Sequence, residues 1–307
     1  MSQHVIDVQH LSKQYRDRRF RTVDAVSDVT FQVMEGEAFG FIGPNGAGKS
    51  TTIKMLTGTI RPTSGSALLM GHPIGEARAR FGMSYVPENP YLYDYLTPLE
   101  ILRTGVAMQK LDLPDVDKHC MAWLDRFEIA HVANRRIRSF SKGMTQRTAL
   151  AHALACKPRL LILDEPLSGL DPVGRKDVVD ILVEYRQQGG AVFFSSHVLH
   201  DVERLADRFG LIHKGQLRTV QHPHELVESA TRMTVRTLGE MPVEGFHQDG
   251  IHRWIGEFER DALWPVLERV RAAGHQIIEV KPGMDLEKTF LTYIGRLPGA
   301  EANPKVN

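Results

Sequence analysis

The residues best suited to chemistry lie in short segments that follow one another along the chain. The first segment reads GPNGAGKST at residues 43–51 and fits the phosphate-loop pattern G-x-x-x-x-G-K-[ST]. Its glycines let backbone N–H groups point at phosphate oxygens, and the helix expected to follow adds its positive end. The residues of this predicted nucleotide site are Gly43, Pro44, Asn45, Gly46, Ala47, Gly48, Lys49, Ser50 and Thr51.

Three side chains of this loop have distinct expected tasks on ATP. Lys49 pairs with the β- and γ-phosphates, the Ser50 hydroxyl coordinates Mg²⁺, and Thr51 reaches the α-phosphate. The alternative is a glycine-rich turn that merely precedes a helix. Because the loop follows an apolar strand pattern at 39–43 and opens a helix pattern, we favour the nucleotide site.

Two acidic residues stand where a second apolar run ends, in the segment LLILDE at 160–165. We expect Asp164 to hold Mg²⁺, directly or through water, and Glu165 to polarise the attacking water. In-line phosphoryl transfer needs such a clamp on charge and a positioned nucleophile. A helix cap or a solvated acidic pair is the alternative, and the phosphate loop upstream argues against it.

The segment FSKGMTQR at 140–147 precedes an apolar helix pattern. Ser141 and Gly143 offer a hydroxyl and free N–H groups at the helix start, which makes a second anion site. One phosphate loop suffices to bind ATP, so a second site suggests a γ-phosphate presented by another subunit. An ordinary serine helix cap is the alternative.

The elements that must position these residues alternate between strands and helices. The continuous apolar runs at 160–164 and 191–196 are typical of covered, parallel strands, and a helix pattern separates them. This order predicts a doubly wound α/β sheet with the site at the carboxyl ends of its strands. After about residue 228 the pattern becomes strand, strand, helix, strand, helix, which indicates a small α+β unit.

Composition and length limit the possible organisation. The chain has 307 residues, a net charge of +1 and two cysteines, Cys120 and Cys156. Neither half is basic enough to suggest nucleic acid as a partner, and the cysteine content favours a reducing compartment. No stretch approaches the ~20 apolar residues of a membrane span. We expect a first domain at 1–228 with a helical part at about 92–156, a second domain at 229–297 and a flexible tail at 298–307.

The whole series of motifs resembles the ATP-binding subunits of ABC transporters over residues 4 to about 225. The order is phosphate loop, signature, acidic strand, SGLDP at 168–172 and SSH at 195–197, and Lys49 lies 92 residues before Ser141. The resemblance implies a P-loop NTPase core with a mixed, mostly parallel sheet, an antiparallel β subdomain and a helical subdomain. SKGM in place of the commoner LSGGQ form is similar to exporter-type members.

The resemblance also implies roles for four further residues. Tyr15 stacks on adenine, unless it is a surface tyrosine. His197 senses the γ-phosphate, unless it is a capping or core histidine. Asp171 bridges two subunits, unless it is only a turn residue. Glu88 stands where the family usually has glutamine, so a carboxylate would reach Mg²⁺ or its water there, unless it is simply solvated. The aromatic run at 91–95 lies where the family docks its membrane partner, although packing under the helical subdomain is also open.

The expected protein is thus an ATP-hydrolysing subunit that pairs head-to-tail with a second copy of itself around two ATP molecules. It drives separate integral membrane permease subunits, for export, from the cytoplasmic face of the inner (plasma) membrane. A soluble ABC-type ATPase with a non-transport role is the first alternative. A GTPase lacks support because no N-K-x-D motif is present, and a kinase does not explain the signature. A regulatory or ligand-binding role of the C-terminal unit stays open.

Overall fold

The computed structural model describes residues 4–16, 21–228, 231–282, 286–293 and 295. The expected tail at 298–307 lies outside these described residues. Contacts divide the chain into two compact units, Met1–Val220 and Gln221–Asn307. This division falls earlier than the boundary expected at 228, so helix α7 (Pro223–Glu228) belongs to the second unit.

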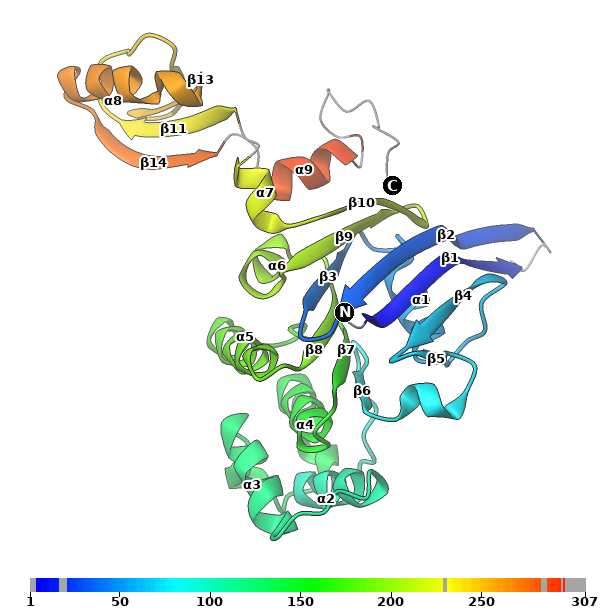
Figure 1. The fold of residues 1–307 in the computed structure, drawn as a ribbon. Helices are drawn as coiled ribbons and strands as arrows, with labels where there is room; N and C mark the ends of the chain where they lie inside the picture. The colour runs from blue at the N-terminus through cyan, green and yellow to red at the C-terminus, as the bar shows by residue number, and fades with distance from the viewer. Residues whose placement is uncertain (1–3, 17–20, 229–230, 283–285, 294, 296–307) are drawn as a thin grey trace. The chain divides into compact units, whose positions relative to one another are not determined.

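A six-stranded sheet carries the chemistry of the first unit (Figure 1). Its strands, in spatial order, are β10 (Gln216–Gln221), β9 (Arg208–His213), β3 (Ala38–Ile42), β8 (Ala191–Ser196), β7 (Leu160–Asp164) and β6 (Met83–Val86). The pairs β9–β3, β3–β8, β8–β7 and β7–β6 are all parallel. The strands predicted at 160–164 and 191–196 are confirmed with the same bounds. Every residue of β3, β7 and β8 is buried, as continuous apolar runs predict.

A second, antiparallel sheet packs on the first through phenylalanines. Its order is β2 (Thr22–Met34), β1 (His4–Arg16), β4 (Ser64–Leu69) and β5 (His72–Pro73). The ring of Phe31 on β2 stacks on Phe39, Phe41 and Phe193, with ring centroids 5.4, 5.5 and 5.6 Å away. These aromatic contacts hold the two sheets together, because offset rings at this spacing add to the burial of a large apolar area.

The helices of the first unit are α1 (Lys49–Leu56), α2 (Pro98–Met108), α3 (Val116–Arg126), α4 (Lys142–Ala155), α5 (Pro172–Gln187) and α6 (Leu199–Leu205). Polar side chains cap the start of α2, α3, α4 and α5. Thr97 and Glu100 form a capping box on α2, and Asp171 caps α5 ahead of Pro172. Helices α2, α3 and α4 pack on one another within the expected helical part. In the described residues, no helix combines the length and apolar character needed to cross a membrane.

The second unit is a four-stranded antiparallel sheet with helices. Its spatial order is β12 (His247–Gly250), β13 (Arg253–Glu259), β11 (Arg232–Leu238) and β14 (Gln276–Pro282). Val266 and Val270 of α8 (Leu263–Ala272) pack with Phe246 and Phe258 in its small core, and α9 (Leu286–Tyr293) follows. No sequence pattern predicts strand β12, because its residues are polar or glycine and all are exposed, so apolar and polar residues do not alternate.

Candidate functional site

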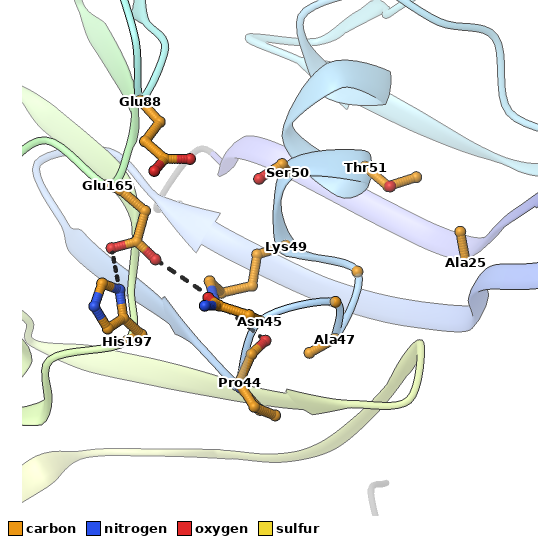
Figure 2. A pocket seen from close by; sticks show the side chains of 12 residues that line it. Ala25, Pro44, Asn45, Ala47, Lys49, Ser50, Thr51, Glu88, Glu165 and His197 are labelled. Carbon is orange, nitrogen blue, oxygen red and sulfur yellow. Dashed lines mark hydrogen bonds and ion pairs between the residues drawn. The ribbon is translucent and has the colours of Figure 1, made fainter. Parts of the chain in front are cut away.

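The phosphate loop connects β3 to α1 and forms one wall of a cavity of about 320 Å³ (Figure 2). Eight of the nine predicted loop residues line it: Pro44, Asn45, Gly46, Ala47, Gly48, Lys49, Ser50 and Thr51. The ninth, Gly43, lies at the loop entrance, where its carbonyl accepts a hydrogen bond of 2.7 Å from Lys49 Nζ. The opposite wall is supplied by Glu88, Glu165 and His197, from three other segments.

At two positions of this loop, the backbone of a neighbouring strand comes so close that only glycine fits. A Cβ on Gly43 would stand 2.3 Å from the carbonyl oxygen of Ile212 on β9. Gly48 has φ +112°, and a Cβ there would stand 2.6 Å from the carbonyl oxygen of Ala25 on β2. The loop is therefore fixed in place by its neighbours on two sides, and larger residues would displace it.

Lys49, Glu165 and His197 form a connected charged group. Lys49 Nζ lies 3.4 Å from Glu165 Oε1, and His197 Nδ1 lies 2.8 Å from Glu165 Oε2. Figure 2 shows the Glu165 carboxylate between the other two side chains. Because a carboxylate only accepts hydrogen bonds, His197 donates through Nδ1, and in a neutral ring Nε2 is then an acceptor. Both Lys49 and Glu165 are nearly buried, so their attraction is weakly screened.

The backbone of Glu165 adopts φ 48°, a left-handed conformation that is uncommon for a residue other than glycine. Strain of this kind costs on the order of 1–3 kcal/mol and persists where surrounding contacts enforce it. Here the Glu165 N–H donates to Ser195 Oγ at 2.9 Å. The conformation turns the carboxylate from the end of β7 into the cavity.

Asp164 sits in a hydrogen-bonded network at the strand ends. Its Oδ1 accepts from Ser195 Oγ at 2.7 Å and from Ser50 Oγ at 3.2 Å. Burial, followed by the negative charge of Asp164, raises the pKa of the neighbouring Tyr85 hydroxyl to about 12. The carboxylate thus joins the phosphate loop to the neighbouring strands β7 and β8.

A second acid lies behind Glu165, outside the predicted set. Asp201 of α6 is 8% exposed, and burial raises the pKa of its carboxyl, although Arg175 Nη1 at 3.9 Å acts in the opposite direction. Asp201, Glu165 and His197 line a smaller cavity of about 120 Å³. This smaller cavity therefore holds both acidic and basic side chains, because Arg175 lines it as well.

The signature residues line a different cavity, of about 540 Å³, which shares no residue with the first. Ser141 caps α4 by accepting from Met144 N–H at 3.3 Å, and Gly143 follows in the first turn. Asp171 lies on the facing loop, where its Oδ1 accepts from Gly174 N–H at 3.2 Å. The structure brings Ser141, Gly143 and Asp171 together, and it keeps them apart from the phosphate loop.

Comparison with known proteins shows the family to which the chain belongs. A profile described as "ABC transporter" matches residues 26–168. An uncharacterized ABC transporter ATP-binding protein of Nostoc sp. is 33% identical over 94% of this chain and 90% of its own length. The chain belongs to the ABC transporter family of ATP-binding proteins. A second uncharacterized family member, from Synechocystis sp., is 38% identical over 69% of this chain, a match that spans 61% of that relative.

Two further relatives of this ABC ATPase carry names that refer to resistance or transport. The linearmycin resistance ATP-binding protein of Bacillus subtilis is 34% identical over 73% of this chain and 71% of its own length. The lantibiotic transport ATP-binding protein of Streptococcus pyogenes is 33% identical over 69% of this chain and 89% of its own.

Solved structures confirm the predicted fold class. The ATP-binding subunit of an ABC transporter superposes with a TM-score of 0.67 and 31% identity, over 73% of this chain and 92% of that one. A dimeric ATP-binding cassette bound to ADP and Pi gives a TM-score of 0.66 over 71% and 98%, at 21% identity. The first unit of this chain is therefore an ABC-type ATPase cassette.

The predicted adenine-stacking residue, Tyr15, lies outside the cavity of the phosphate loop. Tyr15 of β1 is 42% exposed and does not line it, and Lys13 Nζ lies 5.3 Å from its ring centroid. Tyr15 pairs with Val23 on β2, two residues before Ala25, which does line the cavity. Sequence reasoning missed Ala25, because an alanine in a strand carries no chemical signal. The adenine-stacking role of Tyr15 stays a prediction.

Ser195 was also missed as an individual residue, although the segment SSH was noted. Its hydroxyl donates to Asp164 and accepts from the Glu165 N–H, so we expect Ser195→Ala to disturb both acids at once. The free energy of unfolding should fall by about 1–3 kcal/mol because the buried Glu165 N–H loses its acceptor, and ATP turnover should fall. Urea unfolding and a steady-state ATPase assay measure the two effects. Ser66→Ala, on an exposed part of β4, is the matched control and should change neither.

Proposed function

We propose that this ABC ATPase works as a head-to-tail pair, with each ATP held between the phosphate loop of one copy and the signature of the other. The observation that supports this is the separation of two cavities that share no residue, one lined by the phosphate loop and the other by the signature. A single copy can bind phosphate at Lys49 but has no signature residue in that cavity. A second copy, turned by a two-fold axis, would complete both sites identically.

ATP binding in this proposal begins with the phosphate loop. The backbone N–H groups of Gly46 to Ser50 and the start of α1 receive the phosphate oxygens. Ser50, Asp164 and Glu88 supply hard oxygen donors of the kind that Mg²⁺ prefers, and the Ser50 and Asp164 oxygens already lie 3.2 Å apart. When bound, Mg²⁺ neutralises charge on the β- and γ-phosphates.

Hydrolysis in this proposal depends on Glu165 as general base. Its carboxylate accepts the proton of the attacking water while Lys49 holds the departing charge on the phosphates. His197 orients the carboxylate through its 2.8 Å hydrogen bond and reaches the γ-phosphate from the next strand. Asp171 would complete the contact between the two copies. ATP binding would close the pair, and hydrolysis would open it.

We further propose that the pair drives integral membrane subunits for export and binds them at the cytoplasmic face of the membrane. Three tyrosines between β6 and α2 offer a surface for such a partner: Tyr91, Tyr93 and Tyr95 are 94%, 62% and 60% exposed. Exposed aromatic side chains are enriched at protein interfaces. The names of the linearmycin and lantibiotic relatives favour export over import.

Complementation between two inactive variants tests the shared site. Lys49→Ala disables the phosphate loop of its own copy, and Gly143→Asp places a negative charge in the signature cavity of its own copy. Each variant alone should hydrolyse almost no ATP. A mixture should regain a measurable fraction of the wild-type rate, because a mixed pair contains one site built only from intact halves. A mixture as inactive as its two components, with both proteins folded by circular dichroism, would refute the shared site.

A further inference from the structure

Lys142 stands where the commoner LSGGQ form of the signature has a glycine, and it adds a cation to the cavity that the signature residues line. It lies between Ser141 and Gly143 at the start of α4, and its side chain lines the cavity together with both. Its methylene groups pack over Gly169, which has φ +78°; a Cβ there would lie 2.9 to 3.1 Å from them. The stem thus contacts Gly169, and Lys142 is the first residue of a 14-residue helix.

The ammonium group of Lys142 has only a neutral partner. Its Nζ donates to Ser168 Oγ at 3.3 Å, and no carboxylate of the described chain forms an ion pair with it. Arg147, the other strong cation that lines the cavity, is already engaged by the Phe127 carbonyl at 3.1 Å and by Glu128 Oε2 at 2.5 Å. Lys142 is therefore the cation in this cavity that can accept an anionic ligand at the smallest cost.

The position of Ser168 makes an exchange of partners feasible. The Ser168 N–H donates to the Glu165 carbonyl at 3.1 Å, so this loop follows directly from the predicted base. The same loop is held by a second bond from α4, in which the buried Gln146 Nε2 donates to the Pro166 carbonyl at 2.9 Å. If Lys142 released Ser168, the loop would therefore still be bound to α4 through Gln146.

We propose that Lys142 binds the γ-phosphate of the ATP held by the other copy, and that it exchanges the Ser168 hydroxyl for this phosphate when the pair closes. This inference rests on the head-to-tail pairing proposed above. In the present bond to Ser168 only the ammonium group is charged. A bond to phosphate adds the attraction between two opposite charges, so the exchange favours the phosphate. Lys142 thereby adds to the affinity of the closed pair and leaves ATP binding by a single copy unchanged.

The test measures ATP-dependent dimer formation in the Glu165→Gln background, by analytical ultracentrifugation over a range of ATP concentrations. Lys142→Met keeps the stem over Gly169 and removes the charge. It should raise the ATP concentration at half-dimerisation by about tenfold or more, the effect of one hydrogen bond to a charged group. Lys142→Arg should restore dimerisation. Binding of a fluorescent ATP analogue to dilute monomer should be the same in all variants.

Two controls separate this role from a structural one. Lys118→Met removes an exposed lysine on α3, outside the cavity, and should leave dimerisation unchanged. Ser168→Ala breaks the present bond of Lys142 and should not weaken dimerisation. An unchanged Lys142→Met variant, or a Ser168→Ala variant as weak as Lys142→Met, overturns the proposal and leaves the pairing intact. Absence of any ATP-dependent dimer in the Glu165→Gln parent overturns the pairing itself, and this inference with it.

Discussion

Glu165→Gln is expected to reduce ATP turnover by about 10²- to 10⁴-fold, the usual contribution of a positioned general base. The amide cannot accept the proton of the attacking water, but its oxygen can still accept the hydrogen bond from His197 Nδ1. The variant also removes a negative charge 3.4 Å from Lys49 Nζ, which favours binding of the phosphates. ATP should therefore bind at least as tightly as in the wild type and trap the closed pair, which size-exclusion chromatography with ATP would detect.

Glu76→Gln provides the matched control for this substitution, because it makes the same change at an exposed position ahead of a short 3₁₀ helix at Ala77–Arg80. Its turnover should equal that of the wild type. Normal hydrolysis by Glu165→Gln would show that another group activates the water, and it would remove Glu165 from the mechanism.

Lys49→Ala is expected to weaken ATP binding itself, by about ten- to 150-fold if one charged hydrogen bond is lost and by more if two phosphates are affected. Lys49 is 6% exposed and already aligned by the Gly43 carbonyl, so little ordering is needed when phosphates bind. Titration with a fluorescent ATP analogue measures the dissociation constant. In contrast to Glu165→Gln, this variant should form no ATP-dependent dimer.

Lys54 lies on the same helix, α1, but its side chain is exposed to solvent, so Lys54→Ala is the matched control. It should bind ATP as the wild type does, so the comparison separates the site from general helix stability. Equal affinities for Lys49→Ala and the wild type would mean that the phosphates bind elsewhere. A thermal unfolding curve for each variant shows whether the fold is retained.

Local patterns predicted much of the first unit because each depends on few neighbours. The strands at 160–164 and 191–196 are confirmed at both ends, since continuous apolar runs mark strands covered on both faces. The helix predicted to follow the phosphate loop begins at Lys49. Strand β1 extends to Arg16, over residues that no apolar pattern marks, because its pairing with β2 continues there.

What the sequence by itself determined is the set of groups that can handle phosphate. Glycine spacing, an acidic strand end and a capped helix are local features, so the phosphate loop, Asp164, Glu165 and Ser141 stand out along the chain. Tertiary structure decided which of these groups meet. Parallel strands bring Glu165 within reach of Lys49 and His197, whereas the fold holds Ser141 in a separate cavity. The hydrogen bonds of Ser195 and Lys142 likewise depend on contacts between distant segments, and no local pattern encodes such contacts.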